Sequence, residues 1–269
     1  MARKPTDGRE QLQSSLSKPS RKTAKPGKTR LDLLVVARGL AASRERAQAL
    51  LLGGHVRVNG ARMDKPGSQV ADDALVELAG EALKYASRGG FKLEGALEDF
   101  HVSPQNRICL DVGSSTGGFT DCLLQNGARK VYAVDVTPSQ LDWKLRQDPR
   151  VTLVQKNARF LAPGDIPETV SLLVADVSFI SVTKILPAVI PAAEPRADFL
   201  ILIKPQFELE RRDVGKGGIV REAELHEKAI ARVSAAAAEA GLELCGVRPS
   251  HLPGAGGNQE FFLHAQRQG

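Results

Sequence analysis

The chain of 269 residues is 42% hydrophobic and 25% charged, which is the composition of a globular protein large enough for two domains. This balance excludes a low-complexity or fibrous chain. The longest apolar runs, such as Phe199-Leu-Ile-Leu-Ile203, are too short to form a membrane-spanning helix. The net charge is +6, but residues 1–30 alone hold nine Lys or Arg and two acids. We therefore expect a disordered basic tail over residues 1–29, which either binds a polyanion such as nucleic acid or is merely solvated.

The three cysteines, Cys109, Cys122 and Cys245, show no CxxC spacing and cannot all pair within one chain. We expect free thiols, no metal site, and a protein of the reducing cytoplasm. The first thirty residues lack the apolar segment of a signal peptide, so we expect no association with a membrane.

Residues 30–80 predict a compact basic module. Ser43 is a suitable N-cap for a helix, and Asn59-Gly60 is typical of a tight hairpin turn. The expected elements are helices near 31–35 and at 44–52, a strand at 55–58, and a second pair of strands at 68–70 and 74–78. The side chains that we expect to follow a phosphate backbone are Arg38, Arg44, Arg46, Arg57, Arg62 and Lys65.

The order of residues in this module resembles the S4 RNA-binding domain. The resemblance rests on Arg30-Leu-Asp, Gly39-Leu, Ser43-Arg, the stretch Gly54-His-Val-Arg-Val-Asn-Gly60, and Lys65-Pro66, and it covers the whole module. It implies a small α-L fold that binds structured RNA through its basic helix face. From the residues alone, the alternative is that these arginines form a solvated surface.

Residues 81–88 are expected to link this module to a larger domain over residues 89–267. Strands and helices alternate in the larger domain, which is the pattern of a doubly wound α/β sheet. A final antiparallel pair of strands is typical of a methyltransferase sheet rather than of a dinucleotide-binding domain. The expected strands cover 107–110, 130–134, 151–155, 170–175, 198–203, 242–247 and 260–264, and the longest helix covers 222–240.

The stretch Leu110-Asp-Val-Gly-Ser-Ser-Thr-Gly-Gly-Phe-Thr120 joins a buried strand to a helix. Its glycines remove side chains where the backbone must approach a ligand beyond the strand. The pattern departs from the dinucleotide fingerprint because position 115 is Ser, and Asp135 after the next strand can bind two ribose hydroxyls. The stretch looks more like the S-adenosylmethionine site of a Rossmann-type methyltransferase, and the alternative is a plain glycine turn. This resemblance implies a cofactor site formed by Asp111, Gly113, Ser114, Gly117, Gly118, Asp135, Val136 and Asn157.

Charged residues also lie at the ends of later strands. Asp176 and Lys204 each follow a strand, and Glu260 opens the last one. The carboxyl ends of parallel strands meet at one edge of a sheet, so these side chains should share a cleft. A desolvated lysine in such a cleft can receive a proton from a hydroxyl group.

Four motifs in the larger domain resemble those of the TlyA/haemolysin A family. They are Ser87-Arg-Gly-Gly-Phe-Lys-Leu93, Asp176-Val-Ser-Phe-Ile-Ser181, Lys204-Pro-Gln-Phe207 and Gly257-Asn-Gln-Glu260. The catalytic domain of that family is similar to the FtsJ/RrmJ ribose 2′-O-methyltransferases, which use a Lys-Asp-Lys-Glu tetrad. The resemblance implies catalytic roles for Lys92, Asp176, Lys204 and Glu260. With the S4 resemblance it covers residues 30–267 and leaves only the basic tail outside.

The fold class that these resemblances imply is α/β, a Rossmann-like methyltransferase sheet with a small N-terminal S4 (α-L) domain. The implied function is S-adenosylmethionine-dependent 2′-O-methylation of cytidine ribose by a monomer acting on ribosomal RNA or ribosomal subunits. A non-catalytic RNA-binding or ribosome-assembly factor is one alternative, which an intact tetrad disfavours. A membrane-active haemolysin is another, which the lack of a strongly amphipathic cationic helix disfavours.

Overall fold

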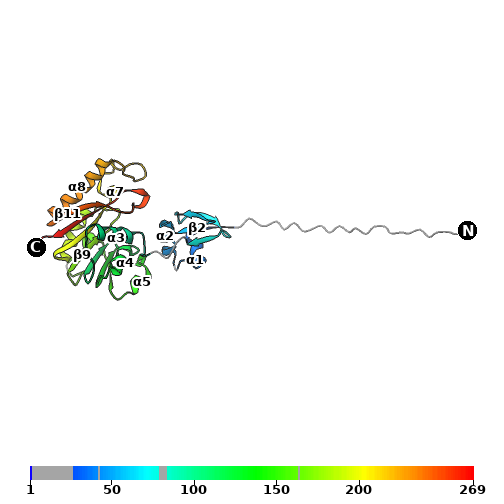
Figure 1. Cartoon of the computed structure of the whole chain (residues 1–269), viewed down its shortest axis with the longest axis horizontal. Helices are drawn as coiled ribbons and strands as arrows, with labels where there is room; N and C mark the ends of the chain where they lie inside the picture. Colours follow the sequence, from blue (N-terminus) through cyan, green and yellow to red (C-terminus); the bar gives the residue numbers. More distant parts are fainter. Residues whose placement is uncertain (2–26, 42, 79–83, 163) are drawn as a thin grey trace.

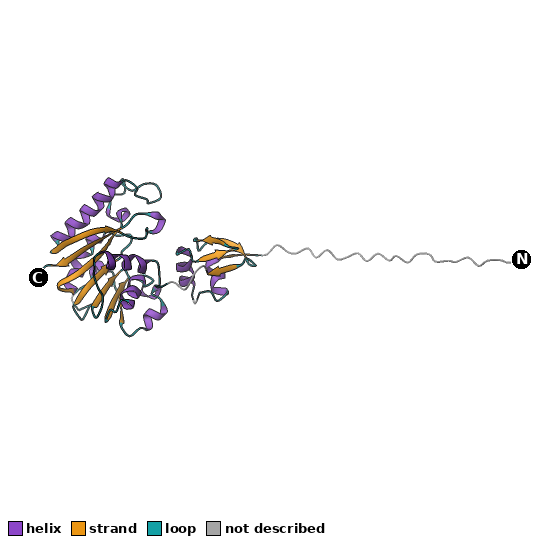
Figure 2. Cartoon of the chain, viewed as in Figure 1, coloured by secondary structure: helices purple, strands orange, loops and turns teal. Residues whose placement is uncertain are grey.

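The structure, a computed structural model, describes Met1 and residues 27–41, 43–78, 84–162 and 164–269. It contains a small N-terminal domain and a larger α/β domain (Figure 1). Short strands and helices make up the small domain, whereas helices cover a long sheet in the large one (Figure 2). Apart from Met1 and residues 27–29, the tail that we expect to be disordered lies outside the described residues.

The small domain packs two short helices against two small sheets. Its helices are α1 (Leu31–Ala37) and α2 (Arg44–Leu52), and its strands are β1 (Lys28–Arg30), β2 (Val56–Val58), β3 (Ala61–Met63), β4 (Gln69–Ala71) and β5 (Val76–Leu78). The predicted N-cap of α2 is confirmed, because the Ser43 hydroxyl accepts a hydrogen bond from the Arg46 backbone N–H at 3.2 Å. Val56, Val58 and Val76 are buried against the two helices in a single apolar core.

The strand pairing in the small domain corrects the prediction in two places. β4 does not pair with β5, because it pairs antiparallel with β1, while β5 lies beside β2. β1 also includes Lys28 and Thr29, which the composition alone assigns to the tail. In strands of three residues, the alternation of apolar and polar side chains shows which of them are buried, but it does not identify the neighbouring strand.

The large domain is built on a seven-stranded sheet with the order β11-β12-β10-β9-β6-β7-β8. Neighbouring strands from β10 to β8 are parallel, and β12 runs antiparallel between β10 and β11, which confirms the predicted methyltransferase topology. The strands are β6 (Ile108–Val112), β7 (Lys130–Asp135), β8 (Val151–Gln155), β9 (Val170–Ala175), β10 (Ala193–Ile203), β11 (Leu242–Pro249) and β12 (Phe261–Arg267). The helices are α3 (Gly89–Asp99), α4 (Gly118–Gln125), α5 (Trp143–Gln147), α6 (Leu186–Val189), α7 (Pro205–Glu208) and α8 (Ala223–Glu239).

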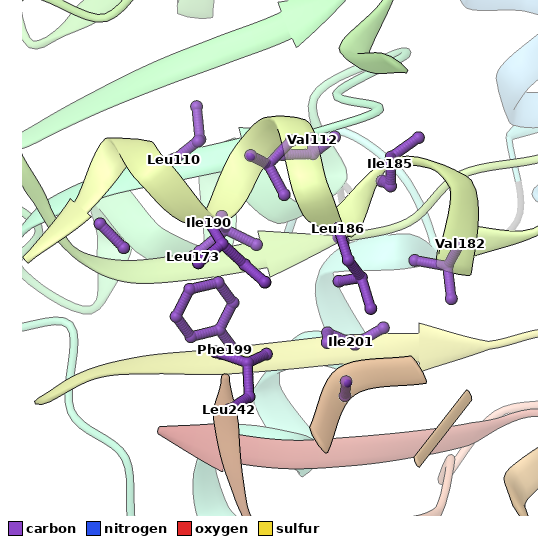
Figure 3. Packing of buried hydrophobic residues seen from close by; sticks show 14 of the residues in the cluster. Leu110, Val112, Leu173, Val182, Ile185, Leu186, Ile190, Phe199, Ile201 and Leu242 are labelled. Carbon is purple, nitrogen blue, oxygen red and sulfur yellow. The ribbon is translucent and has the colours of Figure 1, made fainter. Parts of the chain in front are cut away.

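Successive side chains of the central strands point to opposite faces of the sheet, which divides the core of the large domain into two layers. On β10, Phe199 and Ile201 face the layer that contains α6 and α8, whereas Leu200 and Leu202 face the layer that contains α3 and α4. Figure 3 shows Leu186 of α6 packed toward the sheet in the first layer. Burial on both faces explains why the strands are continuous apolar runs in the sequence.

Residues 84–88, which we expect to be part of a linker, belong to the large domain. Tyr85 is 1% exposed and packs edge-on against Phe91 of α3 with the ring centroids 5.1 Å apart. The Ala86 N–H donates to a carboxylate oxygen of Asp121 on α4 at 2.7 Å. Residues 84–88 therefore fix α3 and α4, and residues 79–83 lie outside the described residues.

A polar network ties the amino-terminal edge of the sheet together. Asp198 of β10 accepts hydrogen bonds from Arg107 at 2.7 Å, from His264 at 2.9 Å and from Gln266 at 2.9 Å. Burial alone would raise the pKa of Asp198, but these donors outweigh it and lower the pKa to about 2. The carboxylate is therefore fully satisfied at the point where β10 and β12 pair.

We predict that this network makes the large domain sensitive to acid. Because the folded-state pKa of Asp198 lies below the usual value of 3.8, its contribution is complete above about pH 4 and is lost as the pH falls toward 2. Asp198→Asn should lower the free energy of unfolding at pH 7 by about 2 kcal/mol, and the difference from wild type should shrink at pH 2. Urea unfolding at both pH values measures this.

Asp213→Asn is the matched control, because Asp213 pairs with the exposed Lys228. An exposed pair contributes less than about 1 kcal/mol. If Asp198→Asn were no more destabilising than Asp213→Asn at pH 7, Asp198 would not stabilise the fold.

Candidate active site

The glycine turn between β6 and α4 requires a close approach of two backbone segments. Gly113 has φ +85°, and a Cβ atom there would lie 2.4 Å from the carbonyl oxygen of Asp176. A Cβ atom on Gly118 would lie 2.9 Å from the backbone nitrogen of Gly90. Any side chain at these two positions would push the ends of β6 and β9, or α3 and α4, apart. The turn is therefore more than a generic loop.

Two buried polar atoms beside this turn have no hydrogen-bond partner among the described residues, namely Asp111 Oδ1 and Ser114 Oγ. The other carboxylate oxygen of Asp111 accepts from the Thr120 hydroxyl at 2.6 Å. Burial raises the pKa of Asp111 to about 7, and the nearby Asp176 adds to this effect. A hydrogen-bond donor or a cation bound at this point would satisfy the free oxygen. The ammonium group of S-adenosylmethionine has that chemistry.

Asp135, Val136 and Asn157 follow β7 and β8, next to the glycine turn. Both Asp135 oxygens already accept backbone hydrogen bonds, from Ser115 at 2.9 Å and from Thr137 at 2.8 Å, so the carboxylate is held at the strand end. The Val136 side chain is 58% exposed. The Asn157 side chain is exposed and caps a short turn by accepting from the Arg159 N–H at 3.0 Å, which leaves it less free for a ligand.

The four predicted catalytic residues come together as two ion pairs. Lys92 of α3 donates to Glu260 at 2.5 Å, and both side chains are buried. Lys204, after β10, pairs with Asp176, after the neighbouring β9. The Lys204 ammonium also donates to Ser178 Oγ at 2.9 Å. Each lysine therefore has a carboxylate partner from a different part of the chain, and the tetrad as a whole is neutral.

A cleft of about 660 Å³ is lined by the glycine turn and by Lys92 and Asp176 of this tetrad. Its large-domain wall includes Lys92, Gly113, Ser114, Gly118 and Asp176. Its small-domain wall includes Ala49, Leu52, Gly53, Arg62 and Asp64. We call it the catalytic cleft. Its size is that of a site for a small molecule or a nucleotide, and both domains reach it.

Three of the predicted RNA-binding arginines make hydrogen bonds to other segments of the protein, and Arg57 donates to the nearby Gly60 carbonyl at 3.4 Å. The acceptors of the three are the carbonyls of Asp72 and Ala74 for Arg38, Asp32 for Arg44, and the carbonyl of Ala86 for Arg46. Arg46 also lies 3.5 Å from Asp142 of the large domain. The other three predicted cations, Arg57, Arg62 and Lys65, are exposed, and Arg62 lines the catalytic cleft.

Sequence relatives cover nearly the whole chain. It is 47% identical to YqxC of Bacillus subtilis over 242 residues, which are 88% of this chain and 85% of that protein. It is 44% identical over 243 residues to a Mycobacterium tuberculosis protein named 16S/23S rRNA (cytidine-2'-O)-methyltransferase TlyA, with 90% and 91% covered. A solved structure described as a hemolysin from Streptococcus thermophilus is 45% identical and matches with a TM-score of 0.71, covering 91% of this chain and 90% of that one.

Family models assign both domains. A model described as FtsJ-like methyltransferase matches residues 85–267, and a model described as S4 domain matches residues 29–76. The chain belongs to the TlyA group of FtsJ-like methyltransferases. Among the described residues of this FtsJ-like methyltransferase, no helix is long and apolar enough to cross a membrane.

Two further residues of this FtsJ-like methyltransferase escape the sequence analysis. Phe179, in the loop after Asp176, is 93% exposed, has φ +65°, and lies with its ring centroid 5.4 Å from that of Phe207. Glu208 ends α7 and is 2% exposed. The sequence signal for Phe179 is its position within the motif that carries Asp176, and Glu208 directly follows the motif that carries Lys204.

Glu208 joins the two loops that carry the Lys204–Asp176 pair. One carboxylate oxygen accepts from the Ser181 hydroxyl at 2.5 Å, and the other accepts from the Val182 N–H at 2.8 Å. Burial raises the pKa of Glu208, while these two hydrogen bonds oppose the rise. Since Glu208 itself lies shortly after Lys204, it holds the loop after β9 against the loop after β10.

We predict that Glu208→Ala slows methyl transfer by roughly 10- to 100-fold, because small displacements of reacting groups are costly. Affinity for the methyl donor should be unchanged, and Glu208→Gln should retain most of the rate because its amide oxygen still accepts a hydrogen bond. Single-turnover transfer of a labelled methyl group measures the rate. Glu210→Gln, at an exposed position, is the control. A wild-type rate for Glu208→Ala would show that the two loops keep their relative position without the Glu208 carboxylate.

Proposed function

We propose that this protein transfers a methyl group from S-adenosylmethionine to the ribose 2′-hydroxyl of a cytidine in ribosomal RNA. The observation that carries the proposal is the pairing of Lys92 with Glu260 and of Lys204 with Asp176 directly beside the glycine turn. The name of the mycobacterial relative supports ribosomal RNA and cytidine as substrate. Free RNA and ribosomal subunits are both compatible with an S4 domain.

The cofactor proposal rests on the fit of the site. Asp111 Oδ1 and Ser114 Oγ would satisfy the polar amino-acid end of S-adenosylmethionine, and Asp135 would bind its ribose hydroxyls. The exposed Val136 would contact the adenine. Gly113, Gly117 and Gly118 leave room along the turn, and Asn157 would line the adenine side. When bound, this cofactor supplies a methyl group on a positively charged sulfur.

The protein's own residues would prepare the hydroxyl. Lys204 in its neutral amine form would accept the hydroxyl proton, and Asp176, which already contacts it, would stabilise the resulting ammonium. Lys92 and Glu260, buried behind the cleft, would orient the hydroxyl and hold Lys204 in position. The reaction neutralises the sulfur, so the leaving group needs no metal for charge stabilisation. The main contribution of the protein is alignment and electrostatics.

The exposed Phe179 ring supports a nucleotide substrate. It stands next to the catalytic Asp176–Lys204 pair and is backed by Phe207. An exposed aromatic ring can stack on an unpaired base of any sequence. A target base that leaves its own helix could therefore be held by Phe179 while its ribose faces Lys204.

The alternatives receive less support. A non-catalytic assembly factor would have no need for four charged side chains brought together from α3, β9, β10 and β12. Haemolysis is suggested only by the names of relatives, such as Hemolysin A of Brachyspira hyodysenteriae and the hemolysin from Streptococcus thermophilus. A monomer in the cytoplasm stays a prediction. Mapping of 2′-O-methyl groups in ribosomal RNA, with and without the protein, tests the proposed function: absence of any dependent site contradicts it.

The role of Lys204 can be tested by two substitutions. If Lys204 accepts the proton, Lys204→Ala should lower single-turnover methyl transfer by about 10²–10⁴-fold with little loss of cofactor or RNA binding. Lys204→Arg should fail as well, because a guanidinium does not release its proton near neutral pH. Turnover close to wild type by Lys204→Arg would instead make Lys204 a fixed positioning charge.

The small domain should supply RNA affinity but not cofactor affinity. Arg57→Glu with Lys65→Glu should weaken RNA binding and flatten its salt dependence, because two exposed phosphate contacts are lost. Arg44→Glu should instead destabilise the small domain, since Arg44 pairs with the buried Asp32. Filter binding at several salt concentrations, with thermal unfolding, separates the two effects. Arg248→Glu, on the distant strand β11, is the control. If the double variant and this control bound RNA with equal affinity, the prediction that the small domain supplies the RNA affinity would be wrong.

A further inference from the structure

A second cleft, of about 320 Å³, lies between α2 of the small domain and the segment before and within α5 of the large domain. We call it the tryptophan cleft, because Trp143 lies in its wall together with Gln140 and Arg146. Ala49 and Thr116 line both this cleft and the catalytic cleft, so the two adjoin. Nothing in the proposed catalytic mechanism uses it.

Trp143 is poorly explained as a core residue. It is 49% exposed, whereas Leu141 and Leu145 on either side of it are 1% and 6% exposed and anchor the segment to the domain core. It is also the single tryptophan of the chain. The largest apolar side chain of the protein is therefore held at the surface of a cleft while its neighbours supply the packing.

Cations accompany the indole. Arg146 lies three residues after Trp143 on α5 and therefore on the same helix face. Its side chain is exposed and has no hydrogen bond or ion pair among the described residues. On the opposite wall, the Arg46 guanidinium lies 3.5 Å from Asp142 and donates to the Ala86 carbonyl at 2.6 Å. The cleft thus offers an aromatic surface, a free cation in Arg146, and the cation of Arg46, which is paired with Asp142; Glu45 also lines it.

We propose that the tryptophan cleft binds an unpaired nucleotide of the substrate RNA close to the methylated one. The base stacks on Trp143 and the adjacent phosphate meets Arg146, which is how proteins bind single-stranded nucleic acid without reading its sequence. The inference rests on the proposed function, in which RNA is the substrate. The two clefts adjoin at Ala49 and Thr116, so an RNA strand in the catalytic cleft can place a neighbouring nucleotide in the tryptophan cleft.

The cofactor fits this cleft less well than a nucleotide does. Gly113, Ser114, Gly118 and Asp176 line the catalytic cleft but are absent from the lining of the tryptophan cleft. It also lies on the α5 side of Thr116, away from Lys92 and Asp176, which line the other cleft. A methyl donor held here would not reach the tetrad.

Because Trp143 is the only tryptophan, its fluorescence reports directly on this cleft. Titration of the full chain with a stem–loop RNA that has unpaired cytidines should quench the fluorescence. The matching RNA duplex without unpaired nucleotides should bind with little quenching, and S-adenosylmethionine alone should also leave the signal largely unchanged. RNA anisotropy measured in parallel gives the affinity independently of the tryptophan.

Substitutions provide a second readout. Trp143→Ala should lower affinity for the stem–loop roughly tenfold, and Trp143→Phe should retain most of it because an aromatic face remains. Arg146→Gln should weaken binding and reduce the salt dependence by about one phosphate contact. Leu244→Ala, which removes a similarly exposed apolar side chain from β11, is the control. Cofactor affinity should not change in any of these variants.

The outcomes separate this inference from the proposed function. Stem–loop binding by anisotropy without tryptophan quenching, or with full affinity in Trp143→Ala, overturns the subsite and leaves the methyltransferase proposal intact. Quenching by S-adenosylmethionine alone overturns it by assigning the cleft to the cofactor. If no RNA binds and no methyl group is transferred to RNA, the proposed function fails and the subsite with it.

Discussion

The site depends on one close backbone contact, between Gly113 after β6 and Asp176 after β9. These strands are parallel neighbours, and the Asp176 N–H donates to the Val112 carbonyl at 2.9 Å. With no Cβ at position 113, the glycine turn lies directly against the loop that carries Asp176. The proposed cofactor turn and the proposed catalytic carboxylate of Asp176 are therefore placed by the same sheet register, and neither can move without the other.

The tetrad extends this constraint across the whole domain. Lys92 and Glu260 are 168 residues apart in the chain, yet their pair is almost completely buried. A buried ion pair gives little net stability, because the desolvation of two charges offsets their attraction. Its persistence here is better explained by function. Glu208 adds a second connection, by hydrogen bonds between the loops after β9 and β10. It therefore orients the Lys204–Asp176 pair without contacting the reacting atoms itself.

Most of the large domain could be predicted from the sequence, because its strands are long apolar runs and Gly113 and Asp135 end two of them. The tetrad was found by resemblance, and the structure brings its members together. Other features depend on tertiary neighbours that no local pattern encodes. The sequence of a three-residue strand such as β4 does not identify the strand that pairs with it. Likewise, no local pattern shows that Tyr85 is a core residue rather than part of a linker, or which groups accept hydrogen bonds from Arg38 and Arg44.

Arg46 shows why the two domains have to be considered together. Its guanidinium contacts two segments of the large domain, at the Ala86 carbonyl and at Asp142. Ala86 in turn donates to Asp121 at the start of α4, and Asp142 donates through its backbone to the Thr116 carbonyl in the glycine turn. Each contact of Arg46 is therefore connected, through one further hydrogen bond, to a segment beside the proposed cofactor site. Arg46, which the sequence pattern assigns to RNA, also links the S4 domain to that site, so the shape of both clefts depends on the S4 domain being in place.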